Sequence, residues 1–308
     1  MDTAPAPSGA QWRIAADGHE ATIVEVGGGL RDYRAGGTEV LYGFAEDELC
    51  PGSAGQILAP WPNRIRDGQY TFDGTAYQLS ISEPPRNNAI HGLVNWSRWH
   101  VVESGPAAVT IEHDLVPQPG YVWPLRLRVT WSVSVDGLRA EHAVTNLGDR
   151  PAPFGLSVHP YVHVPGVAVD DLILTVPAHS RLLADSRLLP IGAARVAGTD
   201  FDYSEGRKIG TTVLDTAFGD LELSPDDRSE VHVETTDGRG VAVWADQAFT
   251  WWQVYTSDTL HPPRQRQAVA IEPMTCPPDA FRSGRDLIVI EPGGQWHGTW
   301  GMRPIVAG

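Results

Sequence analysis

One alternating stretch constrains the fold of this 308-residue chain more than any other feature. From Leu125 to Val135 every second residue is apolar, and every residue between them is polar or charged. A period of two places these apolar side chains on one face of a β-strand. Asp136-Gly137 follows directly and is a strong hairpin signal, so Leu138–Thr145 is expected to be the returning strand. The sequence therefore predicts a long antiparallel hairpin with one buried face.

Further strand patterns occur along almost the whole chain, whereas convincing helical patterns are scarce. The candidates are apolar or β-branched runs of four to six residues, bounded by turn-forming residues. They are 21–26, 109–113, 172–176, 231–235, 240–244, 251–256, 268–272 and 287–290. The 32 glycines and 25 prolines supply turns without reaching the share typical of low-complexity chains. These features predict an all-β fold, a large antiparallel β-sandwich or a barrel.

The chain shows no composition shift or linker that would divide it into several domains. Its first ten residues are rich in Pro, Ala and Ser, and such a terminus is commonly disordered. No repeat of 20–50 residues is evident, which disfavours propellers and solenoids. We expect a disordered tail over residues 1–10 and a single domain over residues 11–308.

The charge balance excludes some classes of partner. The chain has 23 basic and 38 acidic residues, a formal net charge of −15, and Lys208 is its only lysine. A nucleic-acid-binding protein needs a basic face, and the scattered arginines supply none. The same acidity argues against binding to anionic membrane surfaces. We therefore expect neither nucleic acid nor a membrane as a partner, and a monomer in preference to a dimer.

Cysteine usage and the terminus indicate the compartment. Cys50 and Cys276 are too few for a disulfide framework, and no CxxC pattern predicts a metal site. No stretch approaches the about 18 apolar residues of a membrane-spanning helix. The N-terminus lacks the basic start and apolar core of a signal peptide. The sequence predicts a cytoplasmic protein with reduced thiols and without metal or cofactor.

Polar side chains of chemical interest lie in four segments rich in Pro, Gly and aromatic residues. They are Arg64 in 60–68, His91 in 87–96, His159 and His163 in 154–163, and Glu272 in 271–281. Taken singly, each has a commoner structural role, such as a surface ion pair or a partly buried histidine. The two histidines of 154–163 lack an HExxH pattern, and Ser157 lacks the second Gly of GxSxG. Metalloprotease and serine-hydrolase chemistry are therefore not supported.

Glu272 follows the apolar run Ala268–Ile271 and precedes a proline-rich loop. A carboxyl group at such a strand end, near the core, would have its pKa raised by desolvation unless it is paired. A raised pKa would suit Glu272 to act as a general base near neutral pH.

The combination and order of these motifs resemble the aldose 1-epimerase (galactose mutarotase) family, from about Ala21 to Met302. Seven matches occur in the same order along the chain. They are Pro-Asn-Arg-Ile at 62–65, Asn-Ala-Ile-His-Gly at 88–92, His-Pro-Tyr at 159–161, Leu-Asp-Thr-Ala-Phe at 214–218, Gln-Val-Tyr-Thr at 253–256, Ile-Glu-Pro at 271–273 with Pro-Asp-Ala at 278–280, and Glu-Pro-Gly-Gly at 291–294 with Trp296 to Trp300.

The resemblance implies a fold, an activity and roles for individual residues. The family fold is a large antiparallel β-sandwich, often called a supersandwich, in agreement with the strand patterns. The implied activity is interconversion of the α and β anomers of a hexose by acid/base ring opening and reclosure, without metal or cofactor. The implied roles are Glu272 as general base, His159 as general acid, His91 and Arg64 at the ring oxygen and nearby hydroxyls, and Asp215 and Gln253 as hydrogen-bonding partners of sugar hydroxyls.

One position departs from the pattern that many members show. Val158 stands immediately before His159, where many members have Asn, so the sugar-contacting loop is expected to differ there. Aromatic rings could stack on a sugar face, although core packing is the commoner role for any single Trp. The candidates are Trp61, Trp96, Tyr161 and Trp251.

Three alternatives remain open at this point. The substrate could be an anionic sugar, such as a hexose 6-phosphate or a sulfosugar, because Arg suits such oxygens. Arg66, Arg86 and Arg98 are the candidates for binding the anion. The protein could bind carbohydrate without catalysis, because a fold does not fix a function. It could also be a glycoside hydrolase or lyase that uses Glu272 and Asp215 as a carboxylate pair.

Overall fold

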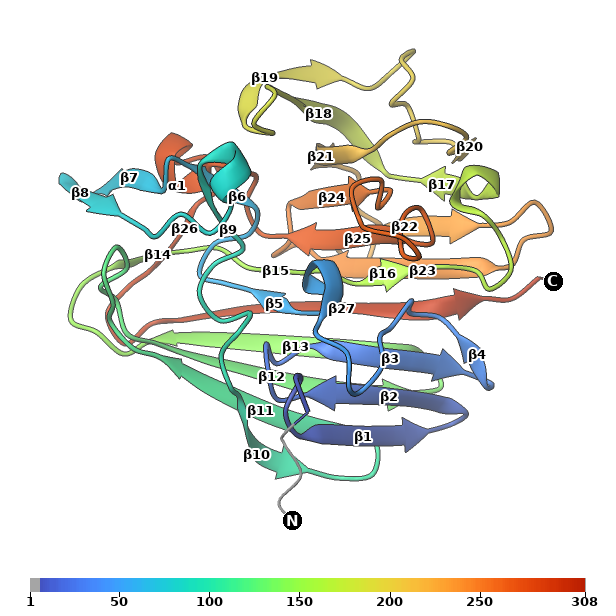
Figure 1. Ribbon diagram of the computed structural model, residues 1–308, viewed down its shortest axis with the longest axis horizontal. Coiled ribbons are helices and arrows are strands. Elements are labelled where there is room, and N and C mark those ends of the chain that lie inside the picture. Colours follow the sequence, from blue (N-terminus) through green and yellow to red (C-terminus); the bar gives the residue numbers. More distant parts are fainter. Residues whose placement is uncertain (1–5, 308) are drawn as a thin grey trace.

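The computed structural model describes residues 6–307, and their secondary structure is almost entirely antiparallel β-strand (Figure 1). The largest sheet has nine strands. In order across it they are β10 (His100–Ser104), β11 (Ala108–Leu115), β12 (Leu125–Ser134), β13 (Gly137–Asn146), β27 (Gln295–Ile305), β23 (Gly240–Asp246), β22 (Arg228–Glu234), β17 (Ile173–Thr175) and β20 (Arg207–Lys208). The all-β prediction is confirmed.

The predicted hairpin is the pair β12–β13, with its turn one residue earlier than expected. Ser134 pairs with Gly137, so Val135 and Asp136 form the two-residue turn. The apolar residues of β12 are all buried, whereas Val135 is 76% exposed because the turn removes it from the alternating face. Gly137 adopts φ +104°, which favours glycine, and it is the first residue of the returning strand.

A second sheet holds three of the polar residues singled out above, Asp215, Gln253 and Glu272. Its strands in order are β19 (Pro190–Arg195), β18 (Ala178–Ala184), β21 (Asp215–Leu221), β24 (Trp251–Tyr255), β25 (Val269–Met274), β15 (Ser157–Val158) and β5 (Ile57–Leu58), with β16 (Tyr161–Val162) also paired with β25. Contacts between β23 and β25 join this sheet to the nine-stranded sheet. Every strand range predicted from the sequence overlaps an observed strand.

The other half of the nine-stranded sheet is covered by a four-stranded sheet near the N-terminus. Its strands are β1 (Gln11–Ala16), β2 (His19–Val24), β3 (Leu30–Ala35) and β4 (Thr38–Glu39). β1 and β2 contact β12, and Figure 1 shows this sheet in front of the long strands. The nine-stranded sheet therefore has one partner sheet over each half, and apolar side chains fill the space between them.

Short elements complete the fold. Three small pairs are β6 (Arg64–Arg66) with β9 (Asn88–Ile90), β7 (Gln69–Phe72) with β8 (Thr75–Gln78), and β14 (Ala152–Phe154) with β26 (Ile288–Ile290). The helical turns are η1 (Pro51–Ser53), η2 (Pro84–Arg86), η3 (Val169–Asp171) and α1 (Ala280–Ser283). The pair β6–β9 connects Arg64 with the segment of His91, because Arg64 pairs with Ile90.

The structure describes only the second half of the predicted N-terminal tail. Residues 1–5 lie outside the described part of the chain. Residues 6–10 are hydrogen bonded to the chain just after β2, where the amide of Val26 donates to the carbonyl oxygen of Ser8, and that of Glu25 donates to Ala10. Ser8 is buried there.

Candidate active site

A pocket of about 220 Å³ lies where β25, β21 and β6 meet the loops around His91 and His159. Pockets for drug-sized ligands usually enclose about 300–1,000 Å³, so this pocket suits a smaller ligand. Its lining includes Arg64, His91, His159, Tyr161, Asp215 and Glu272. Five of the six residues predicted for the site therefore line one pocket, although they come from distant parts of the sequence.

Glu272 and His159 form the centre of the pocket. Nε2 of His159 lies 3.4 Å from Oε1 of Glu272, and their side chains are only 7% and 3% exposed. Oε2 of Glu272 and Nδ1 of His159 have no hydrogen-bond partner among the described residues. Because buried polar atoms are nearly always satisfied, such unpartnered atoms beside a pocket favour a polar ligand.

Burial shifts the pKa values of this pair in opposite directions. Desolvation raises the pKa of Glu272 well above its ordinary value, with a further increase from the charge of Asp215, although Arg64 opposes both. Desolvation lowers the pKa of His159 to about 4. Both shifts favour the uncharged form, a protonated carboxyl group beside a neutral imidazole.

His91 lies beside His159, and its backbone conformation is unusual. The two imidazole centroids are 5.6 Å apart, in an edge-to-face arrangement. His91 adopts φ +64°, and its amide donates to the carbonyl oxygen of Asn63. Left-handed non-glycine residues are uncommon and occur often at functional sites. Burial lowers the pKa of His91 well below its ordinary value, and the charges of His159 and Arg64 lower it further.

Gly92 allows the close packing that fixes His91. Its φ is +75°, and a Cβ atom added there would lie 2.0 Å from the carbonyl oxygen of Ala59. No larger residue fits without moving the backbone. The glycine of the His-Gly motif is therefore required by contact between two backbone segments.

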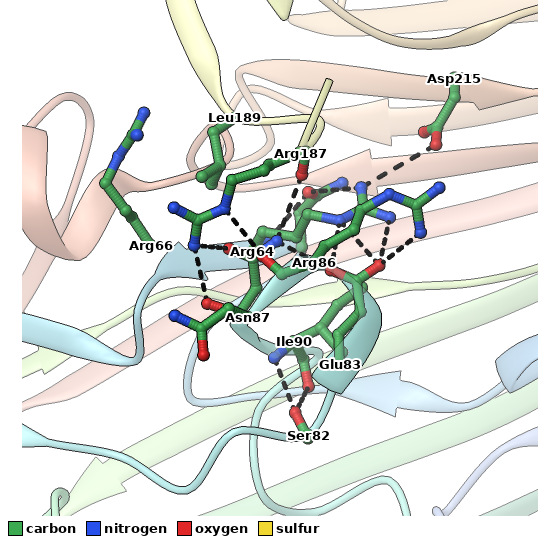
Figure 2. A network of polar contacts seen from close by, with 12 residues as sticks. Arg64, Arg66, Ser82, Glu83, Arg86, Asn87, Ile90, Arg187, Leu189 and Asp215 are labelled. Carbon is green, nitrogen blue, oxygen red and sulfur yellow. Dashed lines mark hydrogen bonds and ion pairs between the residues drawn. The ribbon is translucent and has the colours of Figure 1, made fainter. Parts of the chain in front are cut away.

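Arg64 lines the pocket and takes part in a network of polar contacts that also includes Glu83 and Asp215 (Figure 2). Its Nε and Nη2 atoms donate to the carboxylate of Glu83 at 2.9–3.2 Å. The remaining Nη1 lies 3.9 Å from Oδ2 of Asp215. Asn63 supports the same residue, because its Oδ1 accepts a hydrogen bond from the Arg64 amide.

Asp215 and Gln253 form the opposite side of the site. Nε2 of Gln253 donates to Oδ1 of Asp215 at 2.5 Å, and Gln253 is directly opposite Glu272 in the β24–β25 register. Gln253 does not line the pocket directly, but its Oε1 is buried without a hydrogen-bond partner among the described residues. Burial raises the pKa of Asp215, although Arg64 and Gln253 both oppose the increase.

The four aromatic candidates for stacking on a sugar differ in their position relative to the pocket. Tyr161 lines the pocket and stacks on His159 with ring centroids 4.8 Å apart. Trp61 and Trp251 are buried among other residues, and Trp96 is exposed outside the pocket. Tyr161 is the only one of the four that lines it.

The position that departs from the family pattern does not face the pocket. Val158 is fully buried and pairs with Ile57 of β5, so its side chain belongs to the core. Sequence reasoning also missed some residues of the site. Tyr255 lines the pocket opposite Asp215 in the β21–β24 register, and Glu83 anchors Arg64 from outside it. Tyr255 belongs to the 253–256 motif but was given no role, and the only sequence signal of Glu83 is that it lies five residues before Asn88.

The described residues contain no group of three or more His, Cys, Asp or Glu side chains placed to hold a metal ion. Within residues 6–307, no helix is long and apolar enough to cross a membrane.

Comparison with known proteins decides the family. The sequence model of the aldose 1-epimerase family matches residues 11–303. The chain belongs to the aldose 1-epimerase family. This places the protein among the isomerases, as the sequence motifs predicted.

Relatives of this aldose 1-epimerase family member include named enzymes and an uncharacterised protein. It is 35% identical to the uncharacterised protein YihR of Escherichia coli (strain K12), over 93% of this chain and 90% of YihR. It is 27% identical to the aldose 1-epimerase of the same strain, over 71% of this chain and 66% of that enzyme. A crystal structure of an aldose epimerase homologue from C. elegans has a TM-score of 0.84 at 20% identity, covering 96% and 99% of the two chains. That likeness confirms the fold.

Proposed function

We propose that the protein interconverts the α and β anomers of a hexose by opening and reclosing the sugar ring. The observation that supports this most directly is the buried Glu272–His159 pair, with unpartnered polar atoms in a pocket of monosaccharide scale. A positioned general acid or general base contributes about 10²–10⁴-fold to a rate. A non-catalytic binding site would not require this pair.

The proposed reaction needs one proton on the pair. The Glu272 carboxylate takes the proton of the anomeric hydroxyl, the bond between C1 and the ring oxygen breaks, and His159 protonates that oxygen. The aldehyde then rotates about C1–C2. The new hydroxyl attacks the other face of C1, its proton returns to His159, and Glu272 protonates the former carbonyl oxygen. No net proton is gained or lost.

The neighbouring groups would bind and orient the sugar. Nη1 of Arg64 and the imidazole of His91 are suited to hold the ring oxygen and an adjacent hydroxyl. Asp215 offers acceptors for other hydroxyls, and Gln253 would orient Asp215 through the hydrogen bond from its Nε2 atom. Held in this way, the ring needs little reorganisation before proton transfer.

The pH dependence should report the shared proton. We expect kcat/KM to fall in acid near pH 4, because His159 has a pKa of about 4 and a second proton on the pair leaves no base. We expect it to fall in alkali above the raised pKa of Glu272, because the pair then has no proton to donate. NMR exchange rates, corrected for spontaneous mutarotation at each pH, give this profile. A rate that rises continuously with pH would contradict it.

An anionic sugar is a second candidate substrate, and the position of the Arg86 side chain favours it. Nη1 of Arg86 is paired with Oε1 of Glu83, and the Arg86 side chain is about one third exposed. The charge of Arg86 also lowers the pKa of the Asp215 carboxyl group. Arg66 is paired with Asp185 and Asp279, and Arg98 with Glu25 outside the pocket. Arg86 is therefore the best placed of the three arginines to meet a substituent on the sugar.

A panel of freshly dissolved anomers tests the proposed function. We expect the protein to accelerate interconversion of at least one hexose over buffer, measured by polarimetry or NMR exchange. The panel includes glucose, galactose, a hexose 6-phosphate and a 6-sulfonated hexose. Acceleration of only the last two would favour the anionic candidate. Tight sugar binding without acceleration would contradict catalysis, and reducing-end release from oligosaccharides would favour a hydrolase.

A further inference from the structure

Glu83 is a nearly buried carboxylate just outside the pocket, and the reaction above does not use it. Its side chain is 12% exposed, and it is not among the residues that line the pocket. It accepts hydrogen bonds from three side chains. These are Arg64, Arg86 at 3.0 Å and Asn88 at 2.8 Å. So many donors on one buried carboxylate indicate a fixed orientation.

The contact with Arg64 determines which part of that guanidinium group faces the pocket. Glu83 occupies Nε and Nη2 of Arg64. Only Nη1 is left, 3.9 Å from Asp215 and 3.5 Å from Oδ1 of Asn63. A planar fork held at two nitrogens cannot rotate without losing both bonds.

The segment of Glu83 is itself fastened by a distant part of the chain (Figure 2). Arg187, in the loop between β18 and β19, donates to the carbonyl oxygens of Arg86 and Asn87 at 2.8 Å. It also donates to Oδ1 of Asp67 at 2.7 Å. Glu83 therefore projects from a turn whose backbone is anchored, and the orientation of Arg64 does not depend on a mobile loop.

Glu83 remains ionised despite its burial. Desolvation would raise its pKa, but hydrogen bonds from Arg64 and Asn88 and the charge of Arg64 hold it below the ordinary value. An ionised Glu83 partly offsets the charge of Arg64. Without it, Arg64 would be drawn to the next carboxylate, Asp215, and would compete with the sugar for it.

We propose that Glu83 is a positioning residue that holds Arg64 in the orientation needed to meet the sugar and keeps Arg64 from pairing fully with Asp215. This inference rests on the proposed function, because it assigns the role of Arg64 in substrate binding. It extends that function to a residue that never touches the substrate.

The kinetic test compares the same substitution at two largely buried glutamates, each of which is paired with arginine. We expect Glu83→Gln to lower kcat/KM roughly tenfold to a hundredfold, the range for loss of a hydrogen bond between charged groups. Glu83→Asp, which keeps the charge, should recover part of the loss. The matched control is Glu112→Gln, because Glu112 is a buried carboxylate that pairs with Arg128 on the nine-stranded sheet, outside the pocket. Its activity should stay at the wild-type value.

A double substitution shows whether the effect passes through Arg64. In an Arg64→Lys background, which lacks the fork, Glu83→Gln should change kcat/KM by less than about twofold. Full additivity of the two losses would overturn the proposal. An unchanged kcat/KM in Glu83→Gln, beside an active wild type, would overturn it too.

Carboxyl titration by 13C NMR tests the same inference without activity. Asp215 faces the following charged or titratable groups: Arg64, Glu83, Arg86, Tyr161, Tyr255 and Glu272. Glu83 raises the pKa of Asp215 and Arg86 lowers it, so Glu83→Gln should lower that pKa and Arg86→Gln should raise it. An Asp215 pKa that does not fall in Glu83→Gln would overturn the proposal. If the wild type interconverts no sugar, the proposed function fails, while this titration still tests whether the charge of Glu83 acts on Asp215.

Discussion

Replacing Glu272 with glutamine is expected to reduce anomer interconversion by about 10²–10⁴-fold, the contribution of a general base. The amide has nearly the same shape as the carboxyl group but cannot accept the anomeric proton. Its partner His159, 3.4 Å away, would remain in place. Polarimetry on the preferred sugar measures the loss, because the slow spontaneous reaction provides the baseline.

The same variant should remain folded and should be at least as stable as the wild type. Glu272 is buried and Oε2 has no hydrogen-bond partner among the described residues, so ionising this carboxyl group costs free energy. Folding raises the pKa of Glu272, so its contribution to stability is fully present at pH values below its pKa in the unfolded chain. That contribution is lost as the pH rises through its pKa in the folded protein. Glutamine removes that dependence. Near-wild-type activity in a folded Glu272→Gln protein would refute Glu272 as the base.

Local sequence patterns predicted the strands because their cause is local. Alternation from Leu125 to Val133 and the Asp136-Gly137 turn determine which side chains β12 buries, whatever the rest of the chain does. The turn lies one residue early because turn geometry depends on backbone angles, which a dipeptide motif does not specify fully. The order of strands in the sheets could not be read in this way. β13 pairs with β27, about 150 residues later, and no local pattern encodes that pairing.

The site was predictable only through the ordered motifs. Taken singly, Arg64, His91 and Glu272 each had a commoner structural interpretation, and nothing in their spacing brings them together. Pairing of β6 with β9 places Arg64 beside the segment of His91. Glu272 is brought to them because β15 pairs with both β5 and β25, strands that lie about 100 residues from it in each direction. Glu83 was missed for the same reason, because its function depends on a contact with Arg64 that the sequence does not specify.

Burial opposes the charged form of both members of the proposed acid/base pair. It favours neutral Glu272 and neutral His159, whereas the proposed reaction starts from the carboxylate and the imidazolium. The two states differ by one proton transfer between groups 3.4 Å apart. Sugar hydroxyls and Nη1 of Arg64 would stabilise the charged state once the substrate is bound. Burial thus keeps the proton on the pair, and the ligand determines where it resides.

Replacing His159 with asparagine should also lower interconversion by about 10²–10⁴-fold, through loss of the acid that protonates the ring oxygen. Asparagine can still donate a hydrogen bond, but it cannot transfer a proton. The loss should appear mainly in kcat, because proton transfer occurs in the transition state. Stacking on Tyr161 disappears as well, so circular dichroism and the melting temperature should be recorded with the kinetics.

His91 supplies the matched comparison, because its imidazole lines the same pocket and lies 5.6 Å from that of His159. If His91 only binds the sugar, His91→Asn should raise KM more than it lowers kcat. A folded His159→Asn protein with kcat near the wild-type value, beside a His91→Asn protein that has lost it, would transfer the role of the acid to His91. Because Nε2 of His159 is the imidazole nitrogen that approaches Glu272, we expect the opposite result.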